Sequence, residues 1–370
     1  MKRLLGIIAF VIIVSIITVG LIFYARGYRP DLKNGKVKPT GIVSIRSTPD
    51  NAVVYIDNKQ KGNTNIDVPD LKPGKYKIKV VKEGFSPWEK EVVVEKEAVN
   101  IIEAVMFPTA PSLKALTFIG VDVPVVSPDG KKIAFRVGAP EEKAGIWILN
   151  LSTSALPSFF SKDLINLIKD TKELKFSQSS YEFSPNSKQL LVKYGENSRY
   201  FLLDSTKENG SPKEVTLDIE KIFQEWDKKR SDKRESNLKA LGKEGQDFAA
   251  TYANIDFSPD RTKFIGYKPE GVAQIYDSDP EFTAKKEAKI FDLPAASRYI
   301  WYPDNRHIIL INAGSISILD FDANFNLTIY TGDFDHNTVA PWPDGSQIVI
   351  LTNLNKIASS LPNLYSIQLR

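Results

Sequence analysis

The stretch VVSPDGKKIAF, Val125–Phe135, recurs in four variant copies along the chain. These copies are FSPNSKQLLV at Phe183–Val192, FSPDRTKFI at Phe257–Ile265, WYPDNRHIIL at Trp301–Leu310 and PWPDGSQIVI at Pro341–Ile350. The prolines of the five copies are 57, 74, 44 and 40 residues apart. A fixed motif that returns at such intervals is typical of a β-propeller. The repeat therefore predicts an all-β ring over most of the chain.

Each copy is interpreted as the tight turn between the first two strands of a blade. Proline fixes φ and donates no hydrogen bond, so the inner strand ends there, and Asp-Gly or Asn-Ser then makes the turn. We assign a structural role in these blade turns to Ser127, Pro128, Asp129, Gly130, Ser184, Pro185, Ser258, Pro259, Asp260, Pro303, Asp304, Pro343, Asp344 and Gly345.

A third strand follows most copies and ends in Asp or Asn. The segments are Gly145–Asn150, Arg199–Asp204, Val272–Asp277 and Ser315–Asp320. Each blade then has three visible strands and an outer one. Five copies predict five blades, and a sixth blade without the motif is the alternative.

The Ser-Pro-Asp-Gly motif resembles that of the TolB-like and WD-repeat propellers. The resemblance covers Leu113–Arg370, although Tyr302 and Trp342 replace the motif serine in two copies. It implies a domain that binds proteins, peptides or glycans. Some members of these families carry their propeller beside a hydrolase.

Ring closure is predicted from two segments that lack partners. No outer strand follows Leu364–Leu369, and Ala115–Ile119 precedes the first blade without a partner. Pairing these two strands would join the first and last blades and remove an exposed edge. We therefore expect Ala115–Ile119 to supply the outer strand of the last blade.

A charged insertion at residues 217–247 interrupts the repeat with eight basic and eight acidic residues. Ile219, Ile222, Phe223 and Trp226 have helical spacing, and Leu238 and Leu241 suggest a second short helix. We expect a solvated excursion held by its aromatic stripe, and its deletion should leave the propeller folded. The alternative is a docking arm in which Trp226 contacts a partner. A lesser helix is expected at Ser161–Lys169, with Ser161 as its N-cap.

Residues 41–107 show short alternating strands at intervals of roughly ten residues, which predict a small antiparallel β-sandwich. The segment resembles the PEGA domain through STPDNA at Ser47–Ala52, YID at Tyr55–Asp57, GNT at Gly62–Thr64, LKPGKY at Leu71–Tyr76 and Gly84-Phe85. Asp-Asn stands where that family has Glu-Gly. The resemblance implies a prokaryotic envelope module without catalytic residues. Residues 108–112 are interpreted as a linker to the propeller.

The N-terminal segment, residues 1–25, is predicted to be a membrane anchor. Leu4–Tyr24 holds no charge and no proline, and as a helix it would span about 31 Å, close to the thickness of a bilayer core. The residues assigned to the membrane anchor are Leu4, Ile8, Ile12, Ile16 and Leu21. A cleaved signal peptide is the alternative, but the run is too long and ends in bulky residues.

The basic residues 26–40 are interpreted as a juxtamembrane linker. Residues 1–40 carry seven Lys or Arg against one Asp, and counted literally this bias favours a cytoplasmic location for the domains after the helix. However, large domains after a lone anchor translocate despite such charges. We expect a single-pass membrane protein with its bulk outside the cytoplasm.

Composition argues against most enzyme chemistry. Cysteine is absent and only His307 and His336 are present, so Cys nucleophiles, Cys-ligated metals and clustered-His metal sites are excluded. We predict no catalytic residue, no metal and no cofactor. The part after residue 107 carries 32 basic and 34 acidic residues, which argues against nucleic acid as a partner. His307 is expected to be structural, and His336, in a turn, is a possible partner contact.

The sequence thus predicts a non-enzymatic, membrane-anchored envelope protein. A PEGA-like module would act as a spacer, and a propeller would bind a protein, a peptide or a cell-wall glycan through its loops or central mouth. The alternatives are a propeller-scaffolded envelope hydrolase and a purely structural surface-layer component.

Overall fold

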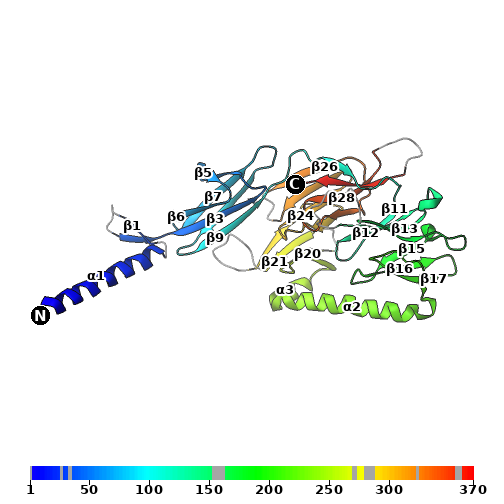
Figure 1. Cartoon of the computed structure of the whole chain (residues 1–370), viewed down its shortest axis with the longest axis horizontal. Helices are drawn as coiled ribbons and strands as arrows, with labels where there is room; N and C mark the ends of the chain where they lie inside the picture. Colours follow the sequence, from blue (N-terminus) through cyan, green and yellow to red (C-terminus); the bar gives the residue numbers. More distant parts are fainter. Residues whose placement is uncertain are drawn as a thin grey trace. The chain divides into compact units, whose positions relative to one another are not determined.

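The computed structural model describes residues 2–25, 28–31, 36–151, 163–268, 273–278, 288–321, 325–354 and 361–370. The chain divides into two compact units. One comprises Met1–Thr109 with Asp279–Glu287, and the other comprises Ala110–Ser278 with Ala288–Arg370. Both are built almost entirely from β-strands, apart from one N-terminal helix and one helical pair (Figure 1).

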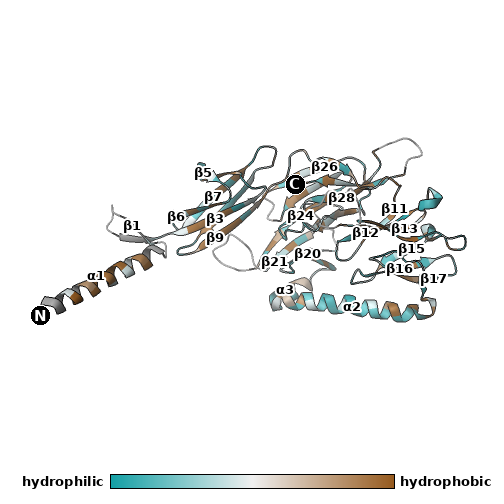
Figure 2. Ribbon diagram, viewed as in Figure 1, coloured by the Kyte–Doolittle hydropathy of each residue, from teal (hydrophilic) through white to brown (hydrophobic). Residues whose placement is uncertain are grey.

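Helix α1, Lys2–Ala25, covers the expected anchor segment and is apolar over most of its length (Figure 2). Ile8, Ile12, Ile16 and Leu21 are all exposed along it, and the Leu4 side chain lies outside the described residues. No helix within the described residues meets the length and hydropathy criteria for crossing a membrane.

The segment expected to be a plain linker contains a β-hairpin. Strands β1, Tyr28–Asp31, and β2, Lys36–Pro39, pair antiparallel from Tyr28 opposite Pro39 to Asp31 opposite Lys36. Residues 26–27 and 32–35 lie outside the described residues. No sequence pattern indicates this pairing, because the strands are short, polar and interrupted by proline.

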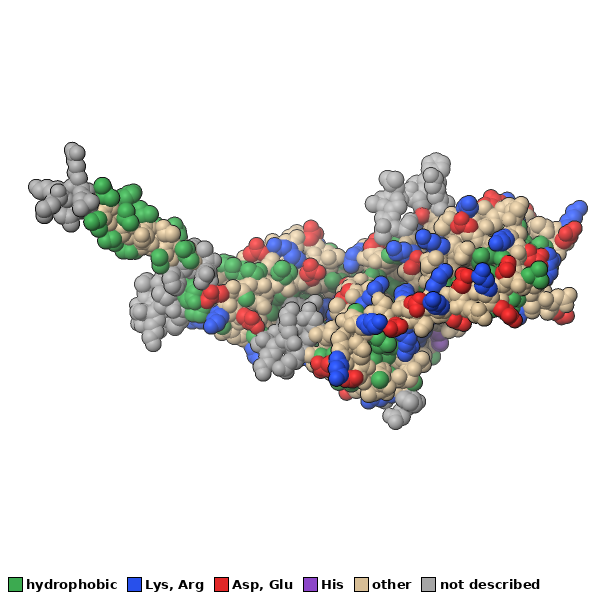
Figure 3. Space-filling model, turned by 90° about the horizontal axis from the view of Figure 1, so that it is seen from below, with side chains coloured by type: hydrophobic (Ala, Val, Ile, Leu, Met, Phe, Trp, Pro, Cys, Tyr) green, Lys and Arg blue, Asp and Glu red, His purple; other side chains and the backbone are tan. Residues whose placement is uncertain are grey.

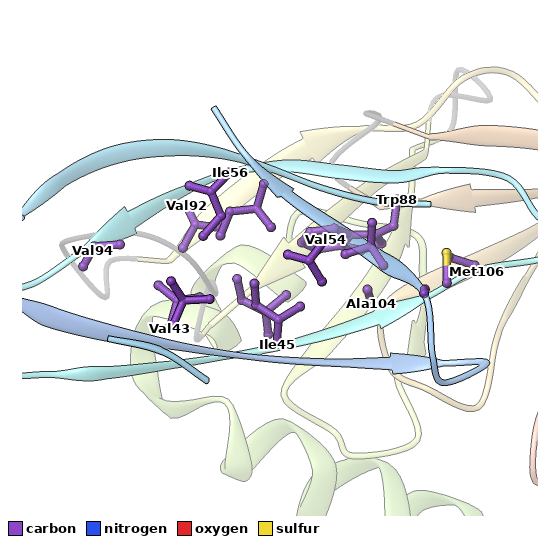
Figure 4. Close-up of a cluster of buried hydrophobic side chains, with 14 residues drawn as sticks. Val43, Ile45, Val54, Ile56, Trp88, Val92, Val94, Ala104 and Met106 are labelled. Atoms are coloured by element: carbon purple, nitrogen blue, oxygen red, sulfur yellow. The ribbon is translucent and has the colours of Figure 1, made fainter. Parts of the chain in front are cut away.

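The rest of the first unit is a two-sheet sandwich. One sheet has the order β6-β3-β9 and the other β5-β4-β7-β8. The strands are β3 Gly41–Thr48, β4 Val53–Ile56, β5 Lys59–Asn63, β6 Ile66–Leu71, β7 Gly74–Val81, β8 Trp88–Val94 and β9 Val99–Val105. Val43 and Ile45 of one sheet face Val54, Ile56 and Val92 of the other across the core (Figure 4).

One strand pair of the sandwich corrects the expectation of a wholly antiparallel fold. Strands β3 and β9 pair in parallel, from Ile42 opposite Val99 to Thr48 opposite Val105. A parallel pair needs a long connection between its strands, and the other sheet of the sandwich supplies it here.

The second unit contains five four-stranded antiparallel sheets, which we call blades 1 to 5. Blade 1 is β11 Asp122–Val126, β12 Lys132–Val137, β13 Gly145–Asn150 and β14 Leu164–Lys169; blade 2 is β15 Ser180–Phe183, β16 Gln189–Tyr194, β17 Arg199–Asp204 and β18 Lys213–Glu214; blade 3 is β19 Asn254–Phe257, β20 Lys263–Tyr267, β21 Ala273–Asp277 and β22 Lys289–Asp292; blade 4 is β23 Arg298–Trp301, β24 His307–Asn312, β25 Ser315–Asp320 and β26 Asn326–Thr331; blade 5 is β27 Val339–Pro341, β28 Gln347–Thr352, β29 Asn363–Gln368 and β10 Leu113–Ala115. Five blades are thus found in the described part of this unit.

The sheets form a ring because apolar clusters join neighbouring blades. Buried side chains of blade 1, such as Ile146, pack against Val192 and its neighbours in blade 2. Ile275 of blade 3 belongs to a cluster shared with blade 4. Phe135 of blade 1 shares another with Val349 of blade 5. This arrangement of blades around an axis is a β-propeller.

The ring closes as the sequence predicts, by strands from the two ends of the unit. Strand β10 pairs antiparallel with β29, with Leu113 opposite Ile367 and Ala115 opposite Tyr365. The Thr117 hydroxyl also accepts a hydrogen bond from the Leu364 N–H at 2.9 Å. The partner strand is therefore confirmed, but β10 lies earlier than the expected segment and shares only Ala115 with it.

The acids that end the third strands of blades 3 and 4, Asp277 and Asp320, are buried and paired. Lys263 Nζ lies 3.7 Å from Asp277 Oδ1 in blade 3, and Arg306 Nε lies 3.2 Å from Asp320 Oδ2 in blade 4. Lys263 is the first residue of the second strand of blade 3, and Arg306 directly precedes the second strand of blade 4. Since an unpaired buried charge is costly, this pairing explains why the third strands of blades 3 and 4 end in acid.

The insertion forms two helices that pack against blades 2 and 3. Helix α2, Ile219–Ala240, is longer than the predicted stripe, and α3, Gly242–Ala249, follows it. Near its start, Trp226 packs with Leu191 and Val215 of the blade 2 side. Near its end, Leu241 and the α3 residues pack on Phe264 and Tyr276 of blade 3. Most of α2 is exposed and its aromatic stripe packs on the blade 2 side, which agrees with a solvated excursion held by that stripe.

The lesser helix expected at Ser161–Lys169 is wrong. Residues Leu164–Lys169 form strand β14, the outer strand of blade 1, and Ser161 lies outside the described residues. Leu167 and Ile168 are both buried. The apolar run fits a helical period, but burial on both faces of a sheet produces the same run.

Candidate functional site

The five repeat turns share one backbone geometry. The residue after each Pro-x pair has a left-handed conformation, with φ between 59° and 71° at Gly130, Ser187, Arg261, Asn305 and Gly345. Its N–H donates to the carbonyl three residues earlier, at 2.8 to 3.2 Å. A type I turn followed by a left-handed residue is a common hairpin connection.

Side chains of the motif reinforce these turns. Ser127 Oγ donates to Asp129 Oδ1 at 2.6 Å, and Ser258 Oγ donates to Asp260 Oδ1 at 2.6 Å. Where Tyr302 replaces the serine, the Asp304 carboxylate instead accepts the His307 N–H at 2.9 Å. The motif residues therefore hold the ends of the inner strands in fixed positions.

The central cavity of the ring, about 790 Å³, is the candidate site. All five motif prolines line it: Pro128, Pro185, Pro259, Pro303 and Pro343. Residues of the inner strands line it as well, among them Ile255 and Ile300. Its volume falls within the range of ordinary ligand sites. The sequence motif that sets the fold thus also sets the wall of the cavity.

Helix α2 adds a basic wall to this cavity. Arg230, Lys233, Arg234 and Asn237 all line it. Their spacing of three, four and seven residues places them on one face of the helix. This face continues the stripe that ends at Trp226. The N-terminal part of the helix therefore packs on blade 2, and the following turns present polar residues to the cavity.

Asn237 is the most enclosed polar residue of this wall. It is 8% exposed, and its Oδ1 accepts no hydrogen bond from the described residues. A buried polar atom without a partner costs free energy. This oxygen is thus left without a donor by the described residues, in a residue that lines the cavity.

Asp256 of blade 3 and Arg298 of blade 4 also line the cavity. Desolvation by the surrounding protein raises the pKa of Asp256 to about 6, although the residue as a whole is exposed, and the nearby Arg298 guanidinium opposes this rise. Arg298 Nη1 donates to the Asn337 carbonyl at 2.9 Å, which fixes the guanidinium between two blades.

The two residues expected to contact partners have different environments. Trp226 is 3% exposed and belongs to the core, so its side chain is not free to bind a partner. His336 is half-buried against Phe334, with the ring centroids 4.9 Å apart, and its carbonyl accepts a bond from Arg298. It therefore lies beside the cavity wall without lining it.

His307 is buried, and its Nδ1 lies 2.6 Å from Asp304 Oδ2, as a structural role requires. No group of His, Asp or Glu residues among the described residues is arranged to hold a metal ion.

Sequence reasoning missed the basic face of α2. Charge alone identifies the insertion, but equal numbers of acids and bases hide which charges share a face. Viewed from the side on which α2 lies in Figure 1, the surface shows mixed Lys, Arg, Asp and Glu (Figure 3). Helical spacing of Arg230, Lys233 and Arg234 after Trp226 was the signal that could have found it.

In the sandwich, the motif residues make structural contacts. The Thr64 hydroxyl accepts the Ala52 N–H at 3.0 Å and bonds with Ser47 Oγ. Asp57 Oδ1 accepts the Lys77 N–H at 2.9 Å. These hydrogen bonds explain why the motif has hydroxyl residues at Ser47 and Thr64 and a carboxylate at Asp57.

Comparison with known families identifies this sandwich. Residues 40–106 match the PEGA domain. The match covers the seven sandwich strands and leaves the five-bladed ring outside it. No curated protein matches the chain.

Several solved structures are similar to the chain. Putative TolB from Agrobacterium tumefaciens is 15% identical, with 64% of this chain and 71% of that one covered and a TM-score of 0.21. TolB from Acinetobacter baumannii is 15% identical, with 80% and 60% covered and a TM-score of 0.24, so the chain spans less than two thirds of that protein. The β-propeller domain of Cps50 (Swd1) from Myceliophteria thermophila is 12% identical, with 70% and 73% covered and a TM-score of 0.22. The propeller assignment rests on the strand pairing and the blade cores described above.

Proposed function

We propose that this protein is a non-enzymatic envelope protein that binds a partner through the central cavity of its propeller. The N-terminal helix anchors it as a single-pass membrane protein with the bulk outside the cytoplasm, and the PEGA domain acts as a spacer. The partner is a protein, a peptide or a cell-wall glycan. The observation that carries this proposal is the cavity of about 790 Å³ lined by every blade.

Site-directed cross-linking tests the proposal on the full chain in the cells that make it. A photoreactive residue at Arg261, which is exposed and lines the cavity, should give a discrete adduct. The same residue at Lys193, exposed on blade 2 and away from the cavity lining, is the matched control. Equal labelling from both positions, or none from either, would contradict a cavity-centred binding function.

The same cells test the anchor and the rival functions. The full chain should remain in the membrane pellet through a carbonate wash with Met1 retained, and release of a product that starts after residue 20 would contradict anchoring. Adducts between copies of the chain would instead support the surface-layer role. Loss of substrate glycan from the envelope that depends on Asp256 would support the hydrolase.

A further inference from the structure

The charge of the central cavity is strongly unbalanced. Six basic residues line it, Lys131, Arg230, Lys233, Arg234, Arg261 and Arg298, against two acids, Asp129 and Asp256. The part of the chain after residue 107 carries slightly more acids than bases. The excess of positive charge is therefore local to the cavity, and low-dielectric walls concentrate the field of such a cluster.

Helix α2 holds its basic residues on a rigid support. Apolar contacts fix it to blade 2 at Trp226 and to blade 3 at Leu241. Arg230 pairs with Asp227 at 2.7 Å, whereas Lys233 and Arg234 make no ion pair with the described residues. Two cations that line the cavity thus have no ion-pair partner among the described residues.

The inner strand of blade 4 adds a third cation to the cavity lining. Carbonyl groups of His336 and Asn337 hold the Arg298 guanidinium at 3.3 and 2.9 Å. Asn237 brings an enclosed amide whose oxygen is unsatisfied. Cations from α2 and from blade 4, together with an unsatisfied amide acceptor, suit a ligand that has both carboxylates and N–H groups, because a peptide backbone can donate to Asn237.

The remaining lining favours a polypeptide over a sugar polymer. The motif prolines and aliphatic side chains such as Ile255 and Ile300 offer apolar contact. The Trp301 indole, a natural platform for stacking sugars, is 6% exposed and its N–H already donates to the Asp256 carbonyl at 3.0 Å. Aliphatic and acidic side chains on one extended segment match both features.

We infer that the inserted helix α2 makes the central cavity a receptor for an acidic peptide segment of a partner protein. Lys233, Arg234 and Arg298 bind its carboxylates, Asn237 accepts a backbone N–H, and the prolines contact its aliphatic side chains. This inference rests on the proposed binding function and specifies the chemistry of the partner.

Fluorescence anisotropy with the full chain in mild detergent tests it. The probe is a labelled octapeptide of alternating glutamate and leucine, with glutamine-for-glutamate and lysine-for-glutamate versions beside it. The acidic peptide should bind and weaken as salt rises. The double variant Lys233→Gln/Arg234→Gln should weaken binding at least tenfold. The matched variant Lys221→Gln/Lys228→Gln, on the outer face of α2, should remain within twofold.

Several outcomes would overturn the inference. They are equal binding of the glutamine peptide, tighter binding of the lysine peptide, no binding at millimolar concentration, or equal effects of the two double variants. An oligomer of galacturonic acid that binds when the peptide does not would assign the site to a glycan. Melting of each variant, measured alongside, separates loss of contact from loss of fold. A cellular adduct at Arg261 that is unchanged by Lys233→Gln/Arg234→Gln would leave the proposed function standing and remove the acidic-peptide site.

Discussion

The junction between blades 5 and 1 is closed by strands, whereas helices fill the junction between blades 2 and 3. At the first, β10 extends the blade 5 sheet, and the apolar faces of blades 5 and 1 pack directly. At the second, α2 and α3 lie against apolar residues of both blades. A helix that packs through one apolar face keeps its other faces free. It can therefore contact two sheets and still present polar side chains to the central cavity.

The largest effect is expected from removing the helical junction. Replacing Asp218–Asp247 by a short Gly/Ser linker removes the cover of two apolar sheet faces, so the ring should lose cooperative unfolding. Circular dichroism and gel filtration of the full chain check this. A variant that melts within about 10 °C of the wild type would show that blades 2 and 3 pack without the helices.

If the deletion variant is insoluble, a point substitution tests whether α2 stabilises the ring. Trp226→Ala should destabilise by about 3–5 kcal/mol, as expected for a large aromatic removed from a core. Lys228→Gln, on the exposed outer face of α2, serves as its control and should be neutral.

A smaller effect is expected at the strand junction. Thr117→Pro removes the N–H that donates to the Leu364 carbonyl and the hydroxyl that bonds with Asn363. It should cost about 3 kcal/mol, measured by chemical denaturation. Thr117→Ser keeps the hydroxyl and should cost far less. If both variants unfold like the wild type, the closing contacts contribute nothing measurable to stability.

The smallest effect on stability is expected from Asp256, which lines the central cavity. Its pKa is raised from 3.8 to about 6 by burial, so its ionised form destabilises the fold. That cost is present above about pH 6 and disappears as the pH falls below about 4. Asp256→Asn should therefore melt a few degrees higher than the wild type at about pH 7.5 and equally at about pH 4. A difference that is the same at both pH values would argue against the raised pKa.

The repeat motif made much of the ring predictable. A proline and a left-handed residue have local conformational requirements, so the five turns and the third strands at Gly145–Asn150, Arg199–Asp204 and Ser315–Asp320 are confirmed at the expected residues. The closing partner β29 followed from an unpaired edge, which is also a local observation.

The features that the sequence did not predict depend on tertiary contacts. The packing of the stripe at Trp226 was expected from its spacing, but the contacts of α3 with Phe264 and Tyr276 required knowing that blade 3 leaves an apolar face for the helices to cover. The parallel pairing of β3 with β9 joins segments more than 50 residues apart. The basic cavity wall combines α2 with inner strands of several blades, and no local pattern links them.

Closure by β10 also means that the ring can be completed only after the last strand of this unit has been synthesised. Lys114 contacts Ser366 across 252 residues, so the first strand of this unit has no partner until the last one has been synthesised. Contacts of such sequence separation form late and slowly. Until then both edges of the incomplete ring offer unpaired backbone groups to other chains. A ribosome stall or truncation near residue 360 should therefore yield an aggregating product even though four blades are complete.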